Sequence, residues 1–178
     1  LLEARGHEVL LRDAHLCATP MDALAEEVRD FAPGMTVVAT APTYLFWRCA
    51  QPELGVPRDL IAQFGRDAGR IVAVGPHGSA TPRTALRKLG ADVVVMGECE
   101  EVVAQLADAR DLASVGSIAF RDRNAILVNG APAAAAFIDA PALHWPDAWI
   151  ARHRHHHHRF DAAPQGLGAE VEASRGCP

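Results

Sequence analysis

Apolar runs and amphipathic stretches alternate along the first two thirds of the chain. Three runs are rich in β-branched residues: "MTVVATA" from residue 35, "RIVAVG" from residue 70 and "ADVVVMG" from residue 91. A shorter apolar run, Val9 to Leu11, precedes them. Continuous apolar runs of this length are typical of parallel strands buried on both faces. We therefore expect four parallel strands.

Helical patterns separate these runs. The stretch "TPMDALAEEVRDFAPG" has Thr19 as a capping residue, Pro20 at the first helical position and apolar residues on one face. Further helices are expected over residues 58–69, 83–90 and 98–110, whereas "PHGSATP" is expected to be a turn. The alternation predicts an α/β fold, a Rossmann-like (flavodoxin-like) parallel sheet with helices on both faces.

The pattern changes after residue 113. Two short apolar runs flank a polar turn in "SIAFRDRNAILVNG", which predicts a β-hairpin. The proline-rich stretch after it predicts an extended linker, and "AEVEAS" predicts one more strand. We therefore divide the chain into a first domain over residues 1–113, a hairpin and linker over residues 114–168, and a further unit that begins at residue 169.

Charge and composition exclude several classes of partner. The formal net charge of −5 over 178 residues gives no basic footprint for nucleic acid. No apolar run approaches the ~18 residues of a membrane-spanning helix, and the first residues lack the order of a secretory signal. We expect a cytoplasmic protein without a membrane partner. The four cysteines form no C-x-x-C pair, so free thiols are expected in a reducing compartment.

The expected sheet locates a candidate binding site. Ligands of open parallel sheets lie outside the carboxyl ends of the strands. After the strand "RIVAVG" comes Gly75–Ser79, where glycines would let the backbone approach a ligand. Neither a G-x-G-x-x-G fingerprint nor a Walker sequence is present. A binding loop and a plain strand-to-helix turn both stay open on spacing alone.

Several stretches in a fixed order resemble one enzyme family. "ARGHEVLLRDA", "FAPGMTVVATAPTYLFW", "RIVAVGPHGSATP" and "GADVVVMGECEEVVAQL" resemble the N-terminal cobalamin-binding domain of cobalamin-dependent radical SAM enzymes. The hairpin, the proline-rich linker and "EVEASRGCP" resemble the segment after this domain in the same family, up to the first strand of the catalytic barrel. The resemblance covers nearly the whole chain and implies that residues 169–178 begin that barrel.

The resemblance also implies a cofactor and the residues that hold it. Cobalamin would lie with its nucleotide tail extended into the carboxyl edge of the sheet. By position, Thr40, Pro42, Thr43 and Tyr44 would line the corrin or the tail, Gly75, Pro76, His77, Gly78 and Ser79 would cradle the tail, and Gly97 and Glu98 would close the far side.

A histidine ligand to cobalt is not expected. "RDAHLCA" matches the D-x-H-x-x-G loop of other cobalamin proteins poorly, because Ala18 stands where glycine is required. His15 is therefore interpreted as a loop residue without a metal role. The run "RHRHHHHRF" is interpreted as an exposed basic strap, with adventitious nickel or zinc binding as the alternative.

Cys177 matches the first cysteine of the family's cluster motif, C-x-x-x-C-x-x-C, after Ser-Arg-Gly and before proline. A 4Fe–4S cluster needs further cysteine ligands, so one cysteine cannot hold it. The resemblance implies that the cluster, S-adenosylmethionine and the rest of the barrel belong to a longer parent enzyme, with radical methyl transfer as its commonest reaction. We expect a fragment whose first strand is missing, inactive alone, with weak or no cobalamin binding.

A second class of function stays open. The same alternation of strands and helices could form a flavodoxin-like module that binds a nucleotide or a sugar nucleotide and performs no radical chemistry. A phosphate-accepting receiver would need clustered aspartates at the end of the first strand, and the sequence has no such cluster. Corrin absorbance and nucleotide-induced thermal stabilisation would separate the two classes.

Overall fold

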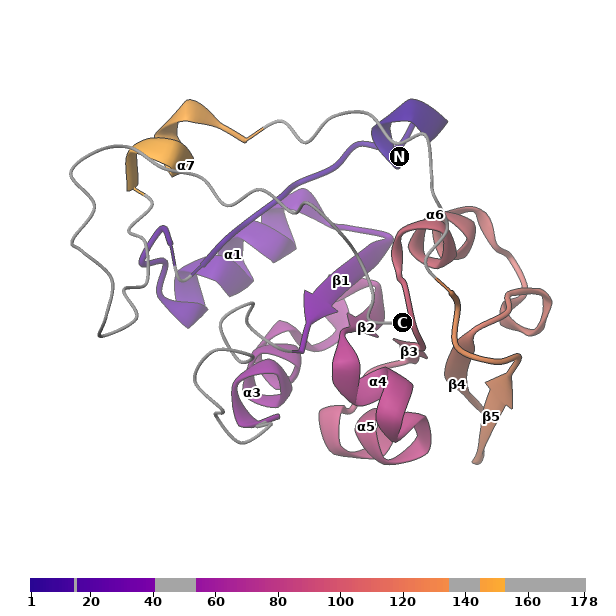
Figure 1. Cartoon of the computed structure of the whole chain (residues 1–178). Helices are drawn as coiled ribbons and strands as arrows, with labels where there is room; N and C mark the ends of the chain where they lie inside the picture. The colour runs from indigo at the N-terminus through magenta and orange to yellow at the C-terminus, as the bar shows by residue number, and fades with distance from the viewer. Residues whose placement is uncertain (15, 41–53, 135–144, 153–178) are drawn as a thin grey trace, which may run out of the picture.

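The computed structural model describes residues 1–14, 16–40, 54–134 and 145–152 (Figure 1). Its centre is one five-stranded sheet in the order β1-β2-β3-β4-β5. The strands are β1 (Met35–Ala39), β2 (Arg70–Val74), β3 (Val93–Val95), β4 (Ile118–Asp122) and β5 (Ala125–Asn129). β1, β2 and β3 run parallel, and the β4–β5 hairpin continues the sheet antiparallel from β3. The predicted hairpin is confirmed.

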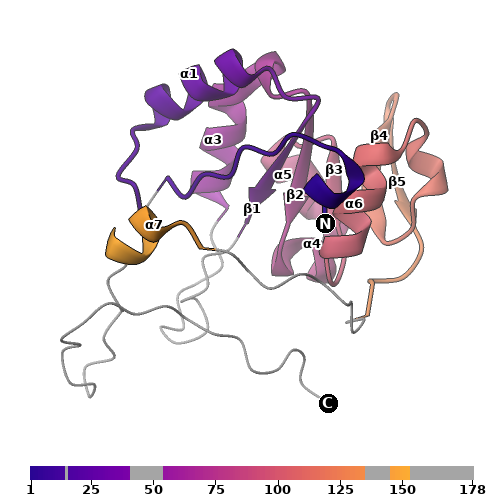
Figure 2. The same cartoon turned by 90° about the horizontal axis from the view of Figure 1, so that it is seen from above.

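Helices cover both faces of this sheet. The helices of the described residues are α1 (Met21–Phe31), α3 (Gly55–Phe64), α4 (Pro76–Ala80), α5 (Pro82–Leu89), α6 (Glu100–Asp108) and α7 (Asp147–Arg152), with 3-10 turns η1 (Glu3–Arg5), η2 (Gly65–Ala68) and η3 (Leu112–Ser114). The faces of the sheet are covered by α1, α3 and α5 on one side and by α6 on the other. Figure 2 shows the strands between the α1 and α3 layer and α6. The fold is the α/β, Rossmann-like open sheet that the alternation predicts.

Alternate residues of the strands build two cores. Val38, Ala73 and Val94 point to the face covered by α1, α3 and α5. Val72 and Val93 point to the opposite face, where α6 and η3 pack. This alternation follows from the two-residue period of a strand. The middle strands β2 and β3 are buried on both faces, which explains their continuous apolar sequence.

Two expectations about the first strands are wrong. Val9 and Leu11 belong to no strand, and their side chains are 40% and 59% exposed. Within the described residues β1 pairs with β2 alone, so it forms the edge of the sheet. On β1, Val38 is buried but Val37 is 40% exposed, so this strand is not covered on both faces. The apolar run before α1 pairs with none of the five strands.

The ends of three helices also differ from the sequence expectation. Pro20, not Thr19, occupies the capping position of α1, and Thr19 caps nothing through its side chain. α3 begins at Gly55, three residues before the expected start. The expected turn "PHGSATP" contains a helix, α4, because Pro76 supplies a fixed φ at a first helical position.

Arginines tie the hairpin to α5. The Arg121 guanidinium donates from Nη2 to the carbonyl oxygen of Leu86 at 3.0 Å and from Nε to that of Ala91 at 3.3 Å. Arg83 donates to the carbonyl oxygen of Ile126 on β5. The three bonds join β4 and β5 to α5 and to Ala91 just beyond its end. The hairpin is thereby fixed to the body of the sheet.

An exposed ion-paired cluster attaches the N-terminal turn to α6. Arg5 bonds Glu101 at 2.8 Å and Asp108 at 3.2 Å, and His7 contacts Asp108 at 3.0 Å. The bond from Arg5 lowers the pKa of Glu101, and the bonds from His7 and then Arg5 lower the pKa of Asp108. In turn the two acids, Glu101 first, raise the pKa of Arg5.

No helix in the described part of the chain has the length and apolar character needed to cross a bilayer.

Candidate functional site

The carboxyl ends of the three parallel strands meet at one edge of the sheet. Thr40 follows β1, Gly75 follows β2, and Gly97 lies two residues beyond the end of β3. Ala39 and Val74 are in register, so the residues after them are neighbours. α4 begins immediately after β2 and lies across this edge (Figure 1). This is the edge at which sheets of this kind bind ligands.

Thr40 and His77 form a buried polar pair at this edge. Thr40 is 4% exposed, and its amide and its hydroxyl both donate to the carbonyl oxygen of Val74, each at 2.9 Å. The Nδ1 atom of His77 lies 3.2 Å from Thr40 Oγ1. The other ring nitrogen of His77, Nε2, is buried and has no hydrogen-bond partner within the described residues. An unsatisfied buried polar atom costs about 1–3 kcal/mol, so it marks a place where a ligand group or a water would bind.

Gly78 brings α4 into close contact with β3. A Cβ atom on Gly78 would lie 2.3 Å from the carbonyl oxygen of Val95 and 2.5 Å from a methyl carbon of Val94. Glycine is therefore required here for the close approach of two backbones. This approach holds His77 and Ser79, which flank Gly78, over the ends of the strands.

Gly97 and Glu98 are bound within the protein through their backbones. The Gly97 amide donates to Ser79 Oγ at 2.8 Å, and the Glu98 amide donates to the carbonyl oxygen of Ala133 at 3.1 Å. Ala133 in turn donates its amide to the carbonyl oxygen of Met96 at 2.9 Å and forms a parallel bridge with Gly97. Neither amide is left to donate to a ligand.

Sequence reasoning missed Ala133, which seals this part of the edge. The contact is made by main-chain atoms and leaves no side-chain pattern in the sequence. The one available signal is Gly97, which has a φ of 80° and where a Cβ atom would lie 2.1 Å from the carbonyl oxygen of Ala133. The Thr40–His77 pair was also missed as a pair, because the two residues are 37 positions apart.

The structure brings most of the expected site residues together. Thr40, His77 and the neighbours of His77 in α4 lie at the carboxyl edge, with Gly97 joined to them through Ser79. Pro76 is exposed. Four of the expected residues lie outside the described residues: Pro42, Thr43, Tyr44 and Cys177.

The histidine and cysteine residues considered as metal ligands fall partly inside and partly outside the described residues. No group of three His, Cys, Asp or Glu side chains suited to a metal ion occurs among the residues that the structure describes. Among the described residues, Cys17 and Cys99 form no disulfide bond. His15, Cys49 and the run over residues 153–158 lie outside the described residues.

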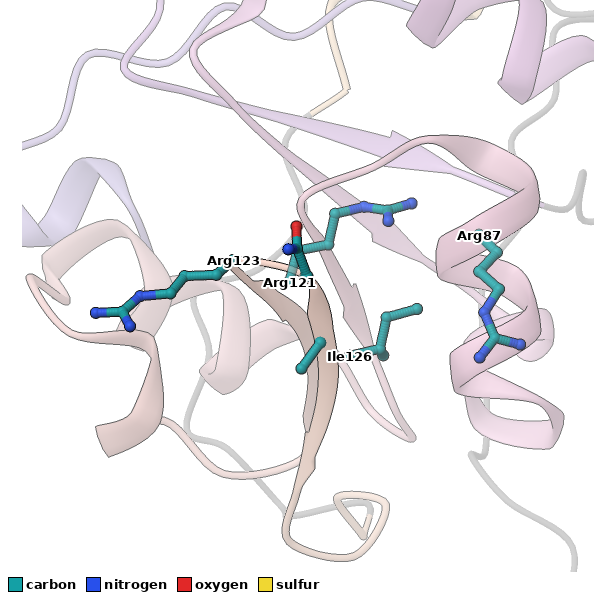
Figure 3. Close-up of a pocket in the computed structure, with 6 residues that line it drawn as sticks. Arg87, Arg121, Arg123 and Ile126 are labelled. Carbon is teal, nitrogen blue, oxygen red and sulfur yellow. The ribbon is translucent and has the colours of Figure 1, made fainter.

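A separate concavity lies where the hairpin turn approaches α5. Its volume is about 340 Å³, and its lining residues are Arg87, Arg121, Arg123, Asn124, Ala125 and Ile126. Figure 3 shows the Arg121 side chain reaching toward α5, while the Arg123 side chain points away from it. The guanidinium of Arg121 donates to the carbonyl oxygens of Leu86 and Ala91, so its role in this concavity is to hold the hairpin against α5. None of the expected site residues lines it.

Solved structures share this fold at low sequence identity. The radical S-adenosylmethionine methyltransferase TsrM from Kitasatospora setae, solved with tryptophan and a SAM analogue, matches 72% of this chain at 21% identity with a TM-score of 0.62. TsrM solved with cobalamin and a 4Fe–4S cluster matches 72% at 23% identity with a TM-score of 0.59. The cobalamin-dependent S-adenosylmethionine radical enzyme OxsB, with aqua-cobalamin and S-adenosylmethionine bound, matches 71% at 16% identity with a TM-score of 0.50.

These matches cover only part of the larger proteins. The chain spans 25% and 24% of the two TsrM chains and 17% of the OxsB chain. No protein-family model matches the sequence, and no curated protein matches it. At these identities the likeness establishes the fold.

Proposed function

We propose that this chain is the cobalamin-binding part of a larger cobalamin-dependent radical SAM enzyme of the methyltransferase type. The observation that carries the proposal is the likeness in fold, over 72% of the chain, to TsrM solved with cobalamin. OxsB, whose structure holds aqua-cobalamin, shares the fold as well. The order of sequence motifs points to the same family independently of the structure.

The carboxyl edge of the sheet is the proposed cobalamin site. The nucleotide tail carries hydroxyl, phosphate and amide groups, and the edge offers a buried nitrogen of His77 that has no hydrogen-bond partner among the described residues. Gly75–Ser79 would contact the tail, with Thr40, Pro42, Thr43 and Tyr44 beside it and Gly97 and Glu98 at the far side. The backbone amides of Gly97 and Glu98 already donate hydrogen bonds within the protein, so these two residues would contact the cofactor without donating to it from the backbone. Bound cobalamin supplies the cobalt centre for methyl transfer.

The remaining chemistry would belong to the larger enzyme. Residues 1–113 would form the cobalamin-binding domain, residues 114–168 the hairpin and linker, and residues 169–178 the start of the catalytic barrel. Cys177 would be the first cysteine ligand of a 4Fe–4S cluster, with its companions four and seven residues further on. The chain spans 25% of the TsrM chain, which agrees with its being part of a larger enzyme.

A binding measurement tests the proposal directly. The chain is dialysed to equilibrium against hydroxocobalamin, with cobinamide, a corrinoid without the nucleotide tail, as the matched ligand. We expect saturable but weak binding of hydroxocobalamin, with a dissociation constant on the order of 10⁻⁴ M. Cobinamide should bind about tenfold more weakly or worse if the tail enters the edge.

The opposite outcome would identify the alternative function. If hydroxocobalamin does not bind saturably up to about 1 mM, while ATP or UDP-glucose raises the melting temperature, the chain is a nucleotide-binding module of the same fold. Equal affinity for hydroxocobalamin and cobinamide would support corrinoid binding but refute the placement of the nucleotide tail at the carboxyl edge of the sheet.

A further inference from the structure

The contacts of Thr40 fix the position of its hydroxyl proton. Thr40 Oγ1 lies 2.9 Å from the carbonyl oxygen of Val74. A carbonyl oxygen has no proton to give, so two oxygens at this distance require the hydroxyl to donate. The hydroxyl has a single proton, which is therefore directed at Val74. Toward every other neighbour, Thr40 Oγ1 can only accept.

The orientation of this hydroxyl decides which nitrogen of His77 carries the proton. His77 Nδ1 is the neighbour that faces the lone pairs of Thr40 Oγ1, at 3.2 Å. Because the oxygen can only accept there, Nδ1 must donate. In a neutral imidazole one nitrogen is a donor and the other an acceptor. Nε2 of His77 is consequently an acceptor, and it is the buried atom for which the described residues provide no partner.

We propose that Thr40 holds His77 in the Nδ1–H form, so that its Nε2 accepts a hydrogen bond from an N–H or O–H group of the bound cofactor. The identity of the cofactor rests on the function proposed above, but the tautomer of His77 does not. In cobalamin such donors are the amides of the corrin side chains, including the secondary amide that links the nucleotide tail, and the ribose hydroxyls of the tail. The phosphate, which accepts hydrogen bonds, is excluded from this position while the ring is neutral.

The first test measures the tautomer without any cofactor. The chain is labelled with ¹⁵N-histidine and studied by NMR at about pH 8, where a histidine ring of ordinary pKa is neutral. The His77→Gln variant identifies the signals of His77. We expect a protonated Nδ1 and an unprotonated Nε2 in the wild type and in Thr40→Ser, and loss of this preference in Thr40→Val.

The chain offers a matched control for the threonine substitution. Thr36 lies on β1, the strand that Thr40 follows, and its hydroxyl donates to the carbonyl oxygen of Ala68 at 2.7 Å. Thr36→Val therefore removes the same kind of bond away from His77, and it should leave the His77 signals unchanged. A protonated Nε2 in the wild type would overturn the proposal, as would an unchanged tautomer in Thr40→Val.

The second test measures the bond to the cofactor. His77→Leu removes the acceptor, and we expect it to weaken binding of hydroxocobalamin by roughly 5- to 30-fold, while Thr36→Val should not weaken it. If the loss persists with cobinamide, the donor is an amide of the corrin side chains, including the one that links the tail, and if it is absent with cobinamide, the donor is a ribose hydroxyl of the nucleotide tail. Unchanged affinity for hydroxocobalamin in His77→Leu would refute the role of Nε2. If the wild type binds no corrinoid, the proposed function fails, and the NMR result still decides the tautomer.

Discussion

Replacement of Gly78 by alanine tests whether α4 is held against β3 as the structure describes. The added Cβ atom would lie 2.3 Å from the carbonyl oxygen of Val95, whereas real Cβ atoms essentially never come closer than 3.0 Å. The two backbones would have to separate by at least 0.7 Å, the difference between these distances. Val95 is part of β3, which is buried on both faces, so it has little freedom to move.

Two opposing effects set the size of the change in stability. Overpacking at a site that cannot relax costs about 1–3 kcal/mol. Alanine in a helix gains about 0.5–1 kcal/mol over glycine, but α4 is too short for this gain to dominate. We expect the free energy of unfolding to fall by roughly 1–2 kcal/mol in Gly78→Ala.

Urea unfolding followed by circular dichroism measures this difference. With a denaturant slope of about 2 kcal/mol/M, the midpoint of Gly78→Ala should fall by roughly 0.5–1 M. Gly116→Ala is the matched control, since an added Cβ atom there would meet nothing within 4 Å among the described residues. Its midpoint should stay close to that of the wild type. If Gly78→Ala were as stable as Gly116→Ala, the close contact between α4 and β3 would be wrong, and so would the placement of His77.

Two further predictions concern the N-terminal turn and the edge of the sheet. Because the pKa values of Glu101 and Asp108 are lowered in the folded state, their ion pairs with Arg5 are present above the ordinary carboxyl pKa and are lost as pH falls below about 4. The protection of the amides in η1 against hydrogen exchange, relative to the intrinsic rate at each pH, should then fall before the sheet unfolds, and equal protection at low and neutral pH would contradict this. On the exposed edge strand β1, Val37→Lys should reduce self-association measured by sedimentation, while Val56→Lys on α3 should not, since charge on an edge strand opposes pairing with other chains.

Local sequence patterns determined the elements that the structure confirms. The apolar runs before Gly75 and Gly97 became β2 and β3, because each is long enough to lie between two helix layers. Gly90 ends α5 in the left-handed conformation, as expected for glycine at this position. The hairpin followed from two apolar runs around a polar turn. The end of α5 and the turn of the hairpin depend on interactions within a few residues, and the strands β2 and β3 can be recognised from their own apolar residues.

The features that sequence reasoning could not supply depend on distant partners. Val9 and Leu11 have strand character, but they pair with none of the described strands, although β1 has an open edge, and nothing in their own residues shows this. The bridge between Ala133 and Gly97 is formed by main-chain atoms, so the identity of residue 133 gives no sign of it in the sequence. The chemical role of His77 depends on Thr40, which comes from another strand. Such pairs become visible only when the order of the strands is known.

The buried Nε2 atom of His77, which has no partner among the described residues, should lower the free energy of unfolding relative to an apolar residue at this position. A leucine at position 77 has a similar volume and removes the buried acceptor, while Thr40 keeps its bond to the carbonyl oxygen of Val74. His77→Leu is therefore expected to raise the free energy of unfolding without cofactor by about 1 kcal/mol, even though it weakens cofactor binding. His77→Gln, which keeps a polar group at this place, should not be stabilised. Thermal unfolding of the three proteins without added ligand measures the difference. A His77→Leu variant less stable than His77→Gln would show that Nε2 is satisfied in solution, and that no ligand group is needed to explain it.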